Sequence, residues 1–248
     1  MNLYVDVGNT ATKFAIDKGA DIELVLIVDT SKILEDVDGA LSSLKLDITR
    51  VFISSVVPSI SDCLKTYFYK KYNVKVSYID PNDDGQIKIE IDDRNELGAD
   101  LLCDLAAANY LVKYPLLIVD LGTATKFLFI DNKGVFFTCA IIQGLELSLQ
   151  NLSKNTALLP LLNFDEVKPL LENRNTKDVL VSSAYYSHVD MINGMVARYK
   201  KAVGYPFKVV LTGGNIDKIA KDLDFDYEIK NNLCLEGIKV IVNLKKDF

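Results

Sequence analysis

Short apolar runs alternate with amphipathic segments along most of the chain. Apolar runs bounded by turn residues predict strands, and apolar residues at a spacing of three to four predict helices. The predicted strands are 3–7, 12–17, 22–28, 50–57, 74–79, 86–91, 116–120 and 208–211. The predicted helices are 31–44, 59–72, 98–112, 177–201 and 233–244, and another begins at residue 144. Residues 153–175 are predicted to form a loop that contains a short helix. Because strands and helices alternate, we predict an α/β protein of two lobes, 1–113 and 114–248.

One short stretch occurs twice. The first copy is Asp6-Val7-Gly8-Asn9-Thr10-Ala11-Thr12-Lys13-Phe14, and the second, with one residue fewer, is Asp120-Leu121-Gly122-Thr123-Ala124-Thr125-Lys126-Phe127. Each lies between two apolar runs, which predicts a strand, a tight turn and a second strand. Glycine allows close approach of a ligand, and turn amides and hydroxyl groups can donate hydrogen bonds to a phosphate. A single Asp-Gly turn is ordinary in hairpins, but two copies in one chain favour a duplicated phosphate-binding fold.

Two acidic residues, Asp6 and Asp100, lie at positions where a carboxylate could take part in chemistry. A carboxylate beside a phosphate-binding turn, such as Asp6, is better suited to a cation that bridges to the phosphate than to the phosphate itself. Lys13 and Lys126 could supply positive charge. Asp100 opens a predicted helix, where the helix dipole favours an acidic residue. It could equally project into a cleft, and its position alone favours neither interpretation. Ser31 and Thr176 are candidate N-caps of their helices.

The composition and net charge argue against several classes of protein and of functional site. Of 248 residues, 49% are hydrophobic and 25% are charged, and the net charge is −6, whereas nucleic-acid-binding proteins usually carry a basic footprint. The four cysteines lie far apart among apolar neighbours, which predicts buried thiols in a reducing cytoplasm and no zinc site. We expect no signal peptide before the first strand and no membrane span. The single histidine, His188, is expected to be an ordinary helix residue, so proton transfer must rest on carboxylates, Lys or Tyr.

The motifs resemble those of one enzyme family. The chain has neither the GxxxxGK[ST] of a P-loop nor the GxGxxG of a Rossmann fold. Two Asp-x-Gly hairpins and a late strand–Gly-Gly–helix resemble instead the superfamily of acetate kinases, sugar kinases, Hsp70 and actin. Within it, the sequence resembles type III pantothenate kinases over essentially its whole length. The other motifs that carry the resemblance are Ile53-Ser54-Ser55-Val56-Val57-Pro58, Gly98-Ala99-Asp100, Gly144-Leu145, Asn175-Thr176 and Thr212-Gly213-Gly214.

The resemblance implies a duplicated ribonuclease H-like (actin-like ATPase) fold with two lobes around a nucleotide cleft. It also implies phosphorylation of pantothenate to 4'-phosphopantothenate, the first step of coenzyme A biosynthesis, by a cytoplasmic homodimer that uses ATP, Mg²⁺ and a monovalent cation (K⁺ or NH₄⁺). Phosphoryl transfer depends on positioning and charge neutralisation, which a chain with one structural histidine can provide.

By the same resemblance, each motif has a role. The ATP-binding residues would be Asp6, Val7, Gly8, Asn9, Thr10, Ala11, Thr12, Lys13 and Thr123. Asp6 would lie near Mg²⁺, and Asp120 would bind the monovalent cation. Asp100 would be the base that takes the hydroxyl proton. The pantothenate contacts would be Gly98, Ala99, Asp100, Leu101 and Thr176, close to the interface of the dimer.

Four positions depart from the family pattern. Leu101 stands where the family usually has Arg, Ile91 and Arg94 replace a usual Tyr and Pro, and Lys126 stands where Thr is frequent. Losing a charged hydrogen bond typically costs about 1.5–3 kcal/mol, or about 10- to 150-fold in binding. We hypothesise that Arg94 replaces the missing charge. Two alternatives remain open: a nucleotide-binding regulator without turnover, and a kinase for a different small hydroxyl compound.

Overall fold

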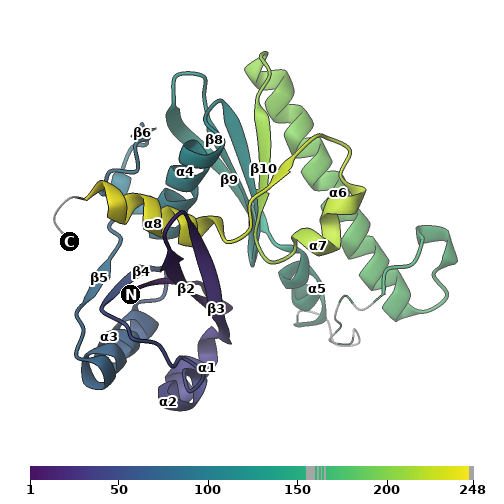
Figure 1. Cartoon of the computed structure of the whole chain (residues 1–248). Coiled ribbons are helices and arrows are strands. Elements are labelled where there is room, and N and C mark those ends of the chain that lie inside the picture. The colour runs from purple at the N-terminus through teal and green to yellow at the C-terminus, as the bar shows by residue number, and fades with distance from the viewer. Residues whose placement is uncertain (155–159, 161, 163, 165, 246–248) are drawn as a thin grey trace. The chain divides into compact units, whose positions relative to one another are not determined.

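The computed structural model describes residues 1–154, 160, 162, 164 and 166–245 (Figure 1). These residues form two compact units. The first unit comprises residues 1–113, 132–137 and the chain from 232 onward, and the second comprises 114–131 and 138–231. This grouping differs from the predicted division at residue 113, because 132–137 and the C-terminal helix make their contacts within the first unit.

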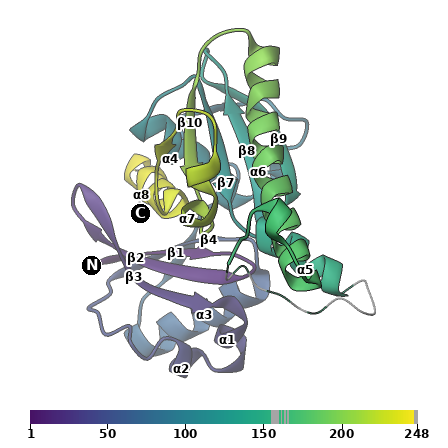
Figure 2. The same ribbon diagram turned by 90° about the vertical axis from the view of Figure 1, so that its right-hand side faces the viewer.

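The first unit is built on a five-stranded sheet in the order β3-β2-β1-β4-β5. Its strands are β1 (Asn2–Val7), β2 (Ala11–Lys18), β3 (Asp21–Asp29), β4 (Arg50–Ser55) and β5 (Val76–Tyr78). Its helices are α1 (Thr30–Glu35), α2 (Val37–Ala40), α3 (Pro58–Tyr72), α4 (Ala99–Leu111) and α8 (Leu233–Leu244). In Figure 2, α1 to α3 lie on one side of this sheet and α4 and α8 on the other. A short strand, β6 (Lys88–Ile89), pairs with residues 135–136, and a 3₁₀ turn follows at Arg94–Glu96.

The second unit repeats the same topology. Its strands are β7 (Leu116–Leu121), β8 (Ala124–Ile130), β9 (Val135–Gln143), β10 (Lys208–Thr212) and β11 (Glu228–Ile229), in the order β9-β8-β7-β10-β11. In each unit, the first strand pairs antiparallel with the second and parallel with the fourth. The predicted α/β class and the duplicated ribonuclease H-like fold are therefore confirmed.

The long helix α6 (Thr176–Val203) provides most of the second unit's helical core. Its buried residues Tyr185, Val189 and Ile192 pack in one cluster with Leu117 and Leu121 of β7. The smaller helices are α5 (Leu145–Lys154), α7 (Ile216–Ile219) and the 3₁₀ turns Leu170–Glu172 and Ala220–Asp222. The predicted loop with a short helix over 153–175 lies partly outside the described residues. Among the residues that the structure describes, no helix is both long and apolar enough to cross a membrane.

The predicted helix 31–44 is wrong in one respect, because the structure divides it. α1 ends at Glu35, and Asp36 then caps α2 by accepting a hydrogen bond from the Gly39 N–H at 2.9 Å. The N-cap of α1 is Asp29 and not Ser31, since the Asp29 carboxylate accepts from the Ser31 N–H at 3.0 Å. Two carboxylate caps thus override a continuous apolar periodicity.

The C-terminal helix α8 belongs to the first unit because it packs closely on α4. A Cβ added at Gly237 would lie 2.0 Å from the Cys103 carbonyl oxygen, so only glycine permits this approach. Farther along α8, Lys239 is 7% exposed and donates to the carbonyl oxygens of Gly19 at 2.6 Å and Asp21 at 2.9 Å. The ammonium group therefore fastens α8 to the turn between β2 and β3.

Replacing Gly237 with alanine tests this helix contact. Because the added methyl group would meet backbone rather than a flexible side chain, we expect Gly237→Ala to destabilise the protein by about 1–3 kcal/mol or more. Gly194→Ala is the matched control. Gly194 lies inside α6 with nothing within 4 Å of an added Cβ, so alanine there should stabilise by about 0.5–1 kcal/mol. Urea unfolding measures both, and equal stability of Gly237→Ala and the parent would contradict the close contact.

Candidate functional site

The first Asp-x-Gly turn is closed by a backbone hydrogen bond and is held in place by two hydrogen bonds from Thr30. The Gly8 N–H donates to the Ala11 carbonyl at 3.1 Å. The Thr30 hydroxyl donates to the Gly8 carbonyl at 2.8 Å, and the Thr30 N–H donates to the Thr10 carbonyl at 3.0 Å. The hydroxyl groups of Thr12 and Thr30 are 3.0 Å apart and buried. Thr30 therefore sets the shape of the turn, a role that no local motif indicated.

The residues assigned to this turn by resemblance differ in exposure. Asn9 and Thr10 are exposed at its tip, and Gly8 and Ala11 are partly exposed. Val7 and Thr12 are buried, at 1% and 0% exposure. The tip can therefore approach a phosphate, whereas the side chains of Val7 and Thr12 face the core and are not available to a ligand.

Asp6 and Lys13 are directly opposite each other on β1 and β2. Opposed residues of an antiparallel pair project from the same face of the sheet, and both residues are partly exposed. Within the described ranges, no group of three or more His, Cys, Asp or Glu residues could hold a metal ion. Mg²⁺ commonly uses one or two carboxylates together with substrate phosphates. A single carboxylate, Asp6, beside a phosphate-binding turn fits that mode of binding.

Asp100 lies at the same edge of the first unit's sheet as this turn. Gly98 is the N-cap of α4, and a Cβ added there would lie 2.3 Å from Asp100 Oδ1 and 3.8 Å from Val56 Cγ1. The Val56 N–H, just beyond β4, donates to the Val7 carbonyl at the end of β1 at 3.2 Å. Asp100 and the first turn therefore meet where the parallel strands β1 and β4 end, the edge at which open α/β sheets bind ligands.

Neighbours of Asp100 have structural roles that the sequence did not indicate. Ala99 and Leu101 are 6% and 7% exposed, so their side chains belong to the core. The Arg94 guanidinium donates to the carbonyl oxygens of Pro81 at 2.8 Å and Asp83 at 2.9 Å. These hydrogen bonds join the end of the polar loop 80–94 to its beginning. They argue against our hypothesis that Arg94 replaces the charge missing at residue 101.

The second turn is enclosed by glycine backbone. The Gly122 N–H donates to the Ala124 carbonyl at 3.2 Å, and the Gly144 N–H donates to the Thr123 carbonyl at 3.0 Å. A Cβ added at Gly144 would lie 2.4 Å from the Thr123 carbonyl oxygen. One added at Gly213, whose φ is +101°, would lie 2.6 Å from the backbone of Leu121 at the end of β7. Three glycine motifs that are separate in sequence thus converge on one turn, and the Thr123 side chain is exposed beside it.

Asp120 does not have the surroundings of a simple cation ligand. Its Oδ2 lies 2.9 Å from Lys126 Nζ, and the two side chains are 13% and 16% exposed. The carboxylate that was expected to bind a monovalent cation is thus already neutralised by an ammonium group of the same chain. The residues present do not fit a monovalent cation at Asp120.

His188 supports the second turn as Thr30 supports the first. Its Nε2 lies 3.0 Å from the Thr125 hydroxyl, and both residues are buried. Thr125 occupies the position in the second copy that Thr12 occupies in the first. Burial lowers the pKa of His188 from its ordinary value of 6.5. The expectation that His188 is a structural helix residue agrees with this contact, although its connection to the turn was not foreseen.

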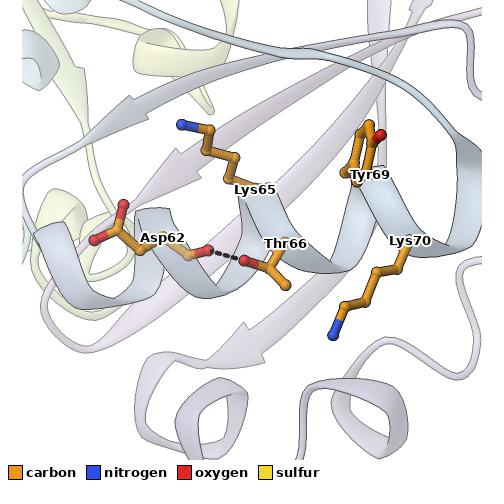
Figure 3. A pocket seen from close by; sticks show the side chains of 5 residues that line it. All are labelled: Asp62, Lys65, Thr66, Tyr69 and Lys70. Atoms are coloured by element: carbon orange, nitrogen blue, oxygen red, sulfur yellow. Dashed lines mark hydrogen bonds between the residues drawn. The ribbon is translucent and has the colours of Figure 1, made fainter.

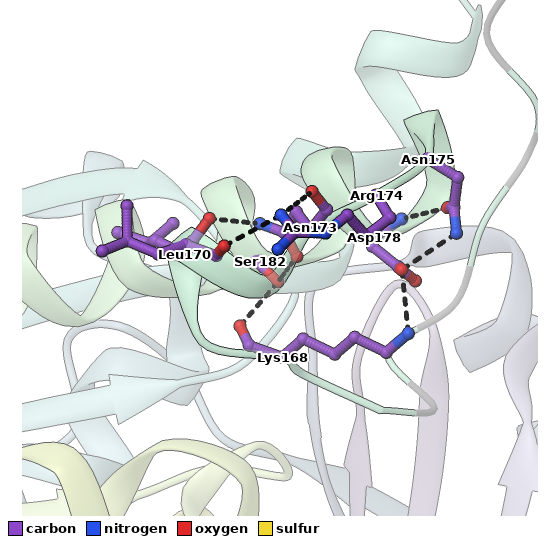
Figure 4. A network of polar contacts seen from close by, with 8 residues as sticks. Lys168, Leu170, Asn173, Arg174, Asn175, Asp178 and Ser182 are labelled. Carbon is purple, nitrogen blue, oxygen red and sulfur yellow. Dashed lines mark hydrogen bonds and ion pairs between the residues drawn. The ribbon is translucent and has the colours of Figure 1, made fainter.

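The start of α6 is held by the polar network of Figure 4. Asn175 is the N-cap and accepts from the Asp178 N–H at 2.9 Å, so the alternative of Thr176 as the cap is wrong. Lys168 Nζ lies 2.8 Å from Asp178 Oδ2, and this contact lowers the pKa of Asp178. The Ser182 hydroxyl donates to the Lys168 carbonyl at 2.8 Å. The network fixes the segment before α6 and leaves Thr176 exposed at the first helical position.

A pocket of about 410 Å³ lies elsewhere, on the exposed face of α3 (Figure 3). Its lining is Asp62, Lys65, Thr66, Tyr69 and Lys70. These residues come from a single helix and include none of the candidate site residues. The pocket is therefore no part of the candidate site.

Known proteins resemble this chain over nearly its full length. A family profile described as "Type III pantothenate kinase" matches residues 2–198. Proteins of that name from Myxococcus xanthus (strain DK1622) and Acholeplasma laidlawii (strain PG-8A) are 30% and 34% identical to the chain. The alignments cover 97% of both chains for the first and 96% of both chains for the second.

A solved structure supports the fold alone. The crystal structure of a putative 2-dehydro-3-deoxygalactonokinase protein from Sinorhizobium meliloti matches with a TM-score of 0.63 at 9% sequence identity. The match covers 100% of this chain and 98% of that chain.

The buried His188 predicts a loss of stability on mild acidification. Because its pKa is lowered in the folded protein, the unfolded chain takes up a proton at a higher pH. Stability should therefore fall as the pH drops through about 6.5, by at most about 1.4 kcal/mol per pH unit for one proton. We expect His188→Gln, which keeps a hydrogen-bonding amide but does not titrate, to lose less stability between about pH 7 and pH 5. Urea unfolding of both proteins measures the difference, and identical pH dependence would contradict it.

Proposed function

Because the chain belongs to the type III pantothenate kinase family, a family of phosphotransferases, we propose that it transfers the γ-phosphoryl group of ATP to the hydroxyl of pantothenate. This reaction produces 4'-phosphopantothenate in coenzyme A biosynthesis. The family inferred from the sequence motifs is confirmed by the profile match and by relatives that cover nearly the whole chain. The observation that carries the proposal is the position of Asp100 at the same sheet edge as the first turn.

In this proposal the first turn holds the ATP phosphates. Support comes from the exposed tip at Asn9 and Thr10 and from the rigid closure of the turn by Thr30. Lys13 adds positive charge on the face that Asp6 shares. Asp6 is the residue that would hold Mg²⁺, which would supply positive charge to neutralise the transferring phosphoryl group.

Asp100 acts in the proposal as the base that accepts the proton of the attacking pantothenate hydroxyl. Its carboxylate lies against the backbone of Gly98 at the start of α4, which restricts where it can point. The buried side chains of Ala99 and Leu101 hold this helical turn in the core. Phosphoryl transfer needs a positioned acceptor more than it needs covalent catalysis, so one fixed carboxylate suffices.

The proposal also gives roles to two exposed threonines of the second unit. Thr123 contacts nucleotide and Thr176 contacts pantothenate, and the exposure of both side chains supports these roles.

The protein acts in the cytoplasm as a homodimer. Support for the dimer comes from Leu171 and Val179, apolar residues on either side of Thr176 that are 90% and 47% exposed.

Removing the Asp100 carboxylate tests the proposed base. We expect Asp100→Asn to lower pantothenate-dependent ADP release by about 100-fold or more, because a positioned general base contributes about that factor. Glu96→Gln is the matched control, since it removes an exposed carboxylate just before the same helix and should leave turnover unchanged.

The outcome also separates the alternative functions. ATP consumption that requires a different hydroxyl compound would favour a kinase of another substrate. If ATP raises the melting temperature but no hydroxyl compound is phosphorylated, the protein is a nucleotide-binding regulator. Full turnover by Asp100→Asn would remove Asp100 from the mechanism while leaving the family assignment intact.

A further inference from the structure

The ion pair between Asp120 and Lys126 lies at the second copy of the repeated turn. The two residues are directly opposite each other on β7 and β8, and Nζ lies 2.9 Å from Oδ2. Both side chains are mostly shielded from water, at 13% and 16% exposure. An ion pair in such surroundings is screened much less than one on the surface.

Backbone crowds the same carboxylate from two sides. A Cβ added at Gly213 would lie 2.6 Å from Asp120 Oδ1, and one added at Gly122 would lie 3.5 Å from that atom. Without a positive partner, this carboxylate would be a poorly hydrated charge, which is costly. The site therefore requires a cation, and the chain supplies one.

The charge of Lys126 also reaches the next strand. Partial desolvation raises the pKa of the Cys139 thiol on β9, which is exposed and not buried as predicted, and the nearby Lys126 ammonium acts in the opposite direction. Lys126 lies on β8, the strand between β7 and β9 in the sheet, and its ammonium group contacts Asp120 on β7.

We infer that the Lys126 ammonium group replaces a monovalent cation at Asp120 and makes the protein independent of K⁺ and NH₄⁺. An ammonium group carries the same single charge as either ion and donates hydrogen bonds to the carboxylate. A free cation at the same oxygen atoms would be repelled by Lys126. The consequence for catalysis rests on the proposed kinase function, but the binding behaviour of the site does not.

The test compares potassium dependence in matched variants of the full chain. Melting temperature is measured in rising KCl or NH₄Cl, with tetramethylammonium chloride keeping the ionic strength constant. Lys126→Thr removes the charge and leaves space and a hydroxyl group, and Lys126→Arg keeps the charge. Lys230→Thr is the control, because it removes a lysine from an exposed pair with Glu228 at 3.6 Å in the same unit.

We expect no specific effect of K⁺ or NH₄⁺ on the parent, Lys126→Arg or Lys230→Thr. Lys126→Thr should melt at a lower temperature in tetramethylammonium and recover by about 2 °C or more in K⁺ or NH₄⁺. Its pantothenate-dependent turnover should rise by about 10-fold or more with either ion. The response should disappear when Asp120→Asn is added to Lys126→Thr, since the charge that attracts the ion is then absent.

Three results would overturn the inference. The first is a specific rise in the melting temperature of the parent with K⁺. The second is a Lys126→Thr variant that matches the parent without either ion. The third is a loss of stability in Lys126→Thr that neither ion restores, which would make Lys126 only a structural partner of Asp120. The melting curves need no substrate, so they remain decisive even if the protein does not phosphorylate pantothenate.

Discussion

The cross-strand register of two hairpins is the constraint on which the rest of the structure depends. It pairs Asp6 with Lys13 in the first unit and Asp120 with Lys126 in the second. Because side chains alternate along a strand, this register also sends the neighbouring threonine of each copy into the core. A slip by one residue would exchange the charged and the apolar face. The positions of the carboxylates and the packing of both sheets therefore follow from the same pairing.

The two copies of the repeated turn have the same strand register but different surroundings. The first turn has a longer, exposed tip, and its support is the hydroxyl group of Thr30 at the start of α1. The second turn is shorter and is enclosed by the backbone of Gly144 and Gly213, with His188 as its support. We interpret the open copy as the phosphate-binding turn and the enclosed copy as a site whose charge is balanced internally.

The sequence was sufficient for the features that depend on local pattern. Apolar runs beside Asp-x-Gly predicted both hairpins, and the Gly98-Ala99-Asp100 motif predicted the start of α4. Features that depend on distant partners were missed. No periodicity indicates that Thr30 or His188 supports a turn, or that Lys239 binds carbonyl groups far away in the chain. The Asp120–Lys126 pair follows from the hairpin register, so the sequence already contained the signal for it.

Mass spectrometry of the products formed from ATP and pantothenate by the purified protein tests the central claim most directly. The account predicts that pantothenate gains one phosphoryl group for each ADP released. Other small hydroxyl compounds offered in the same mixture should remain unmodified. Unchanged pantothenate, whether ATP is consumed or not, would contradict the account.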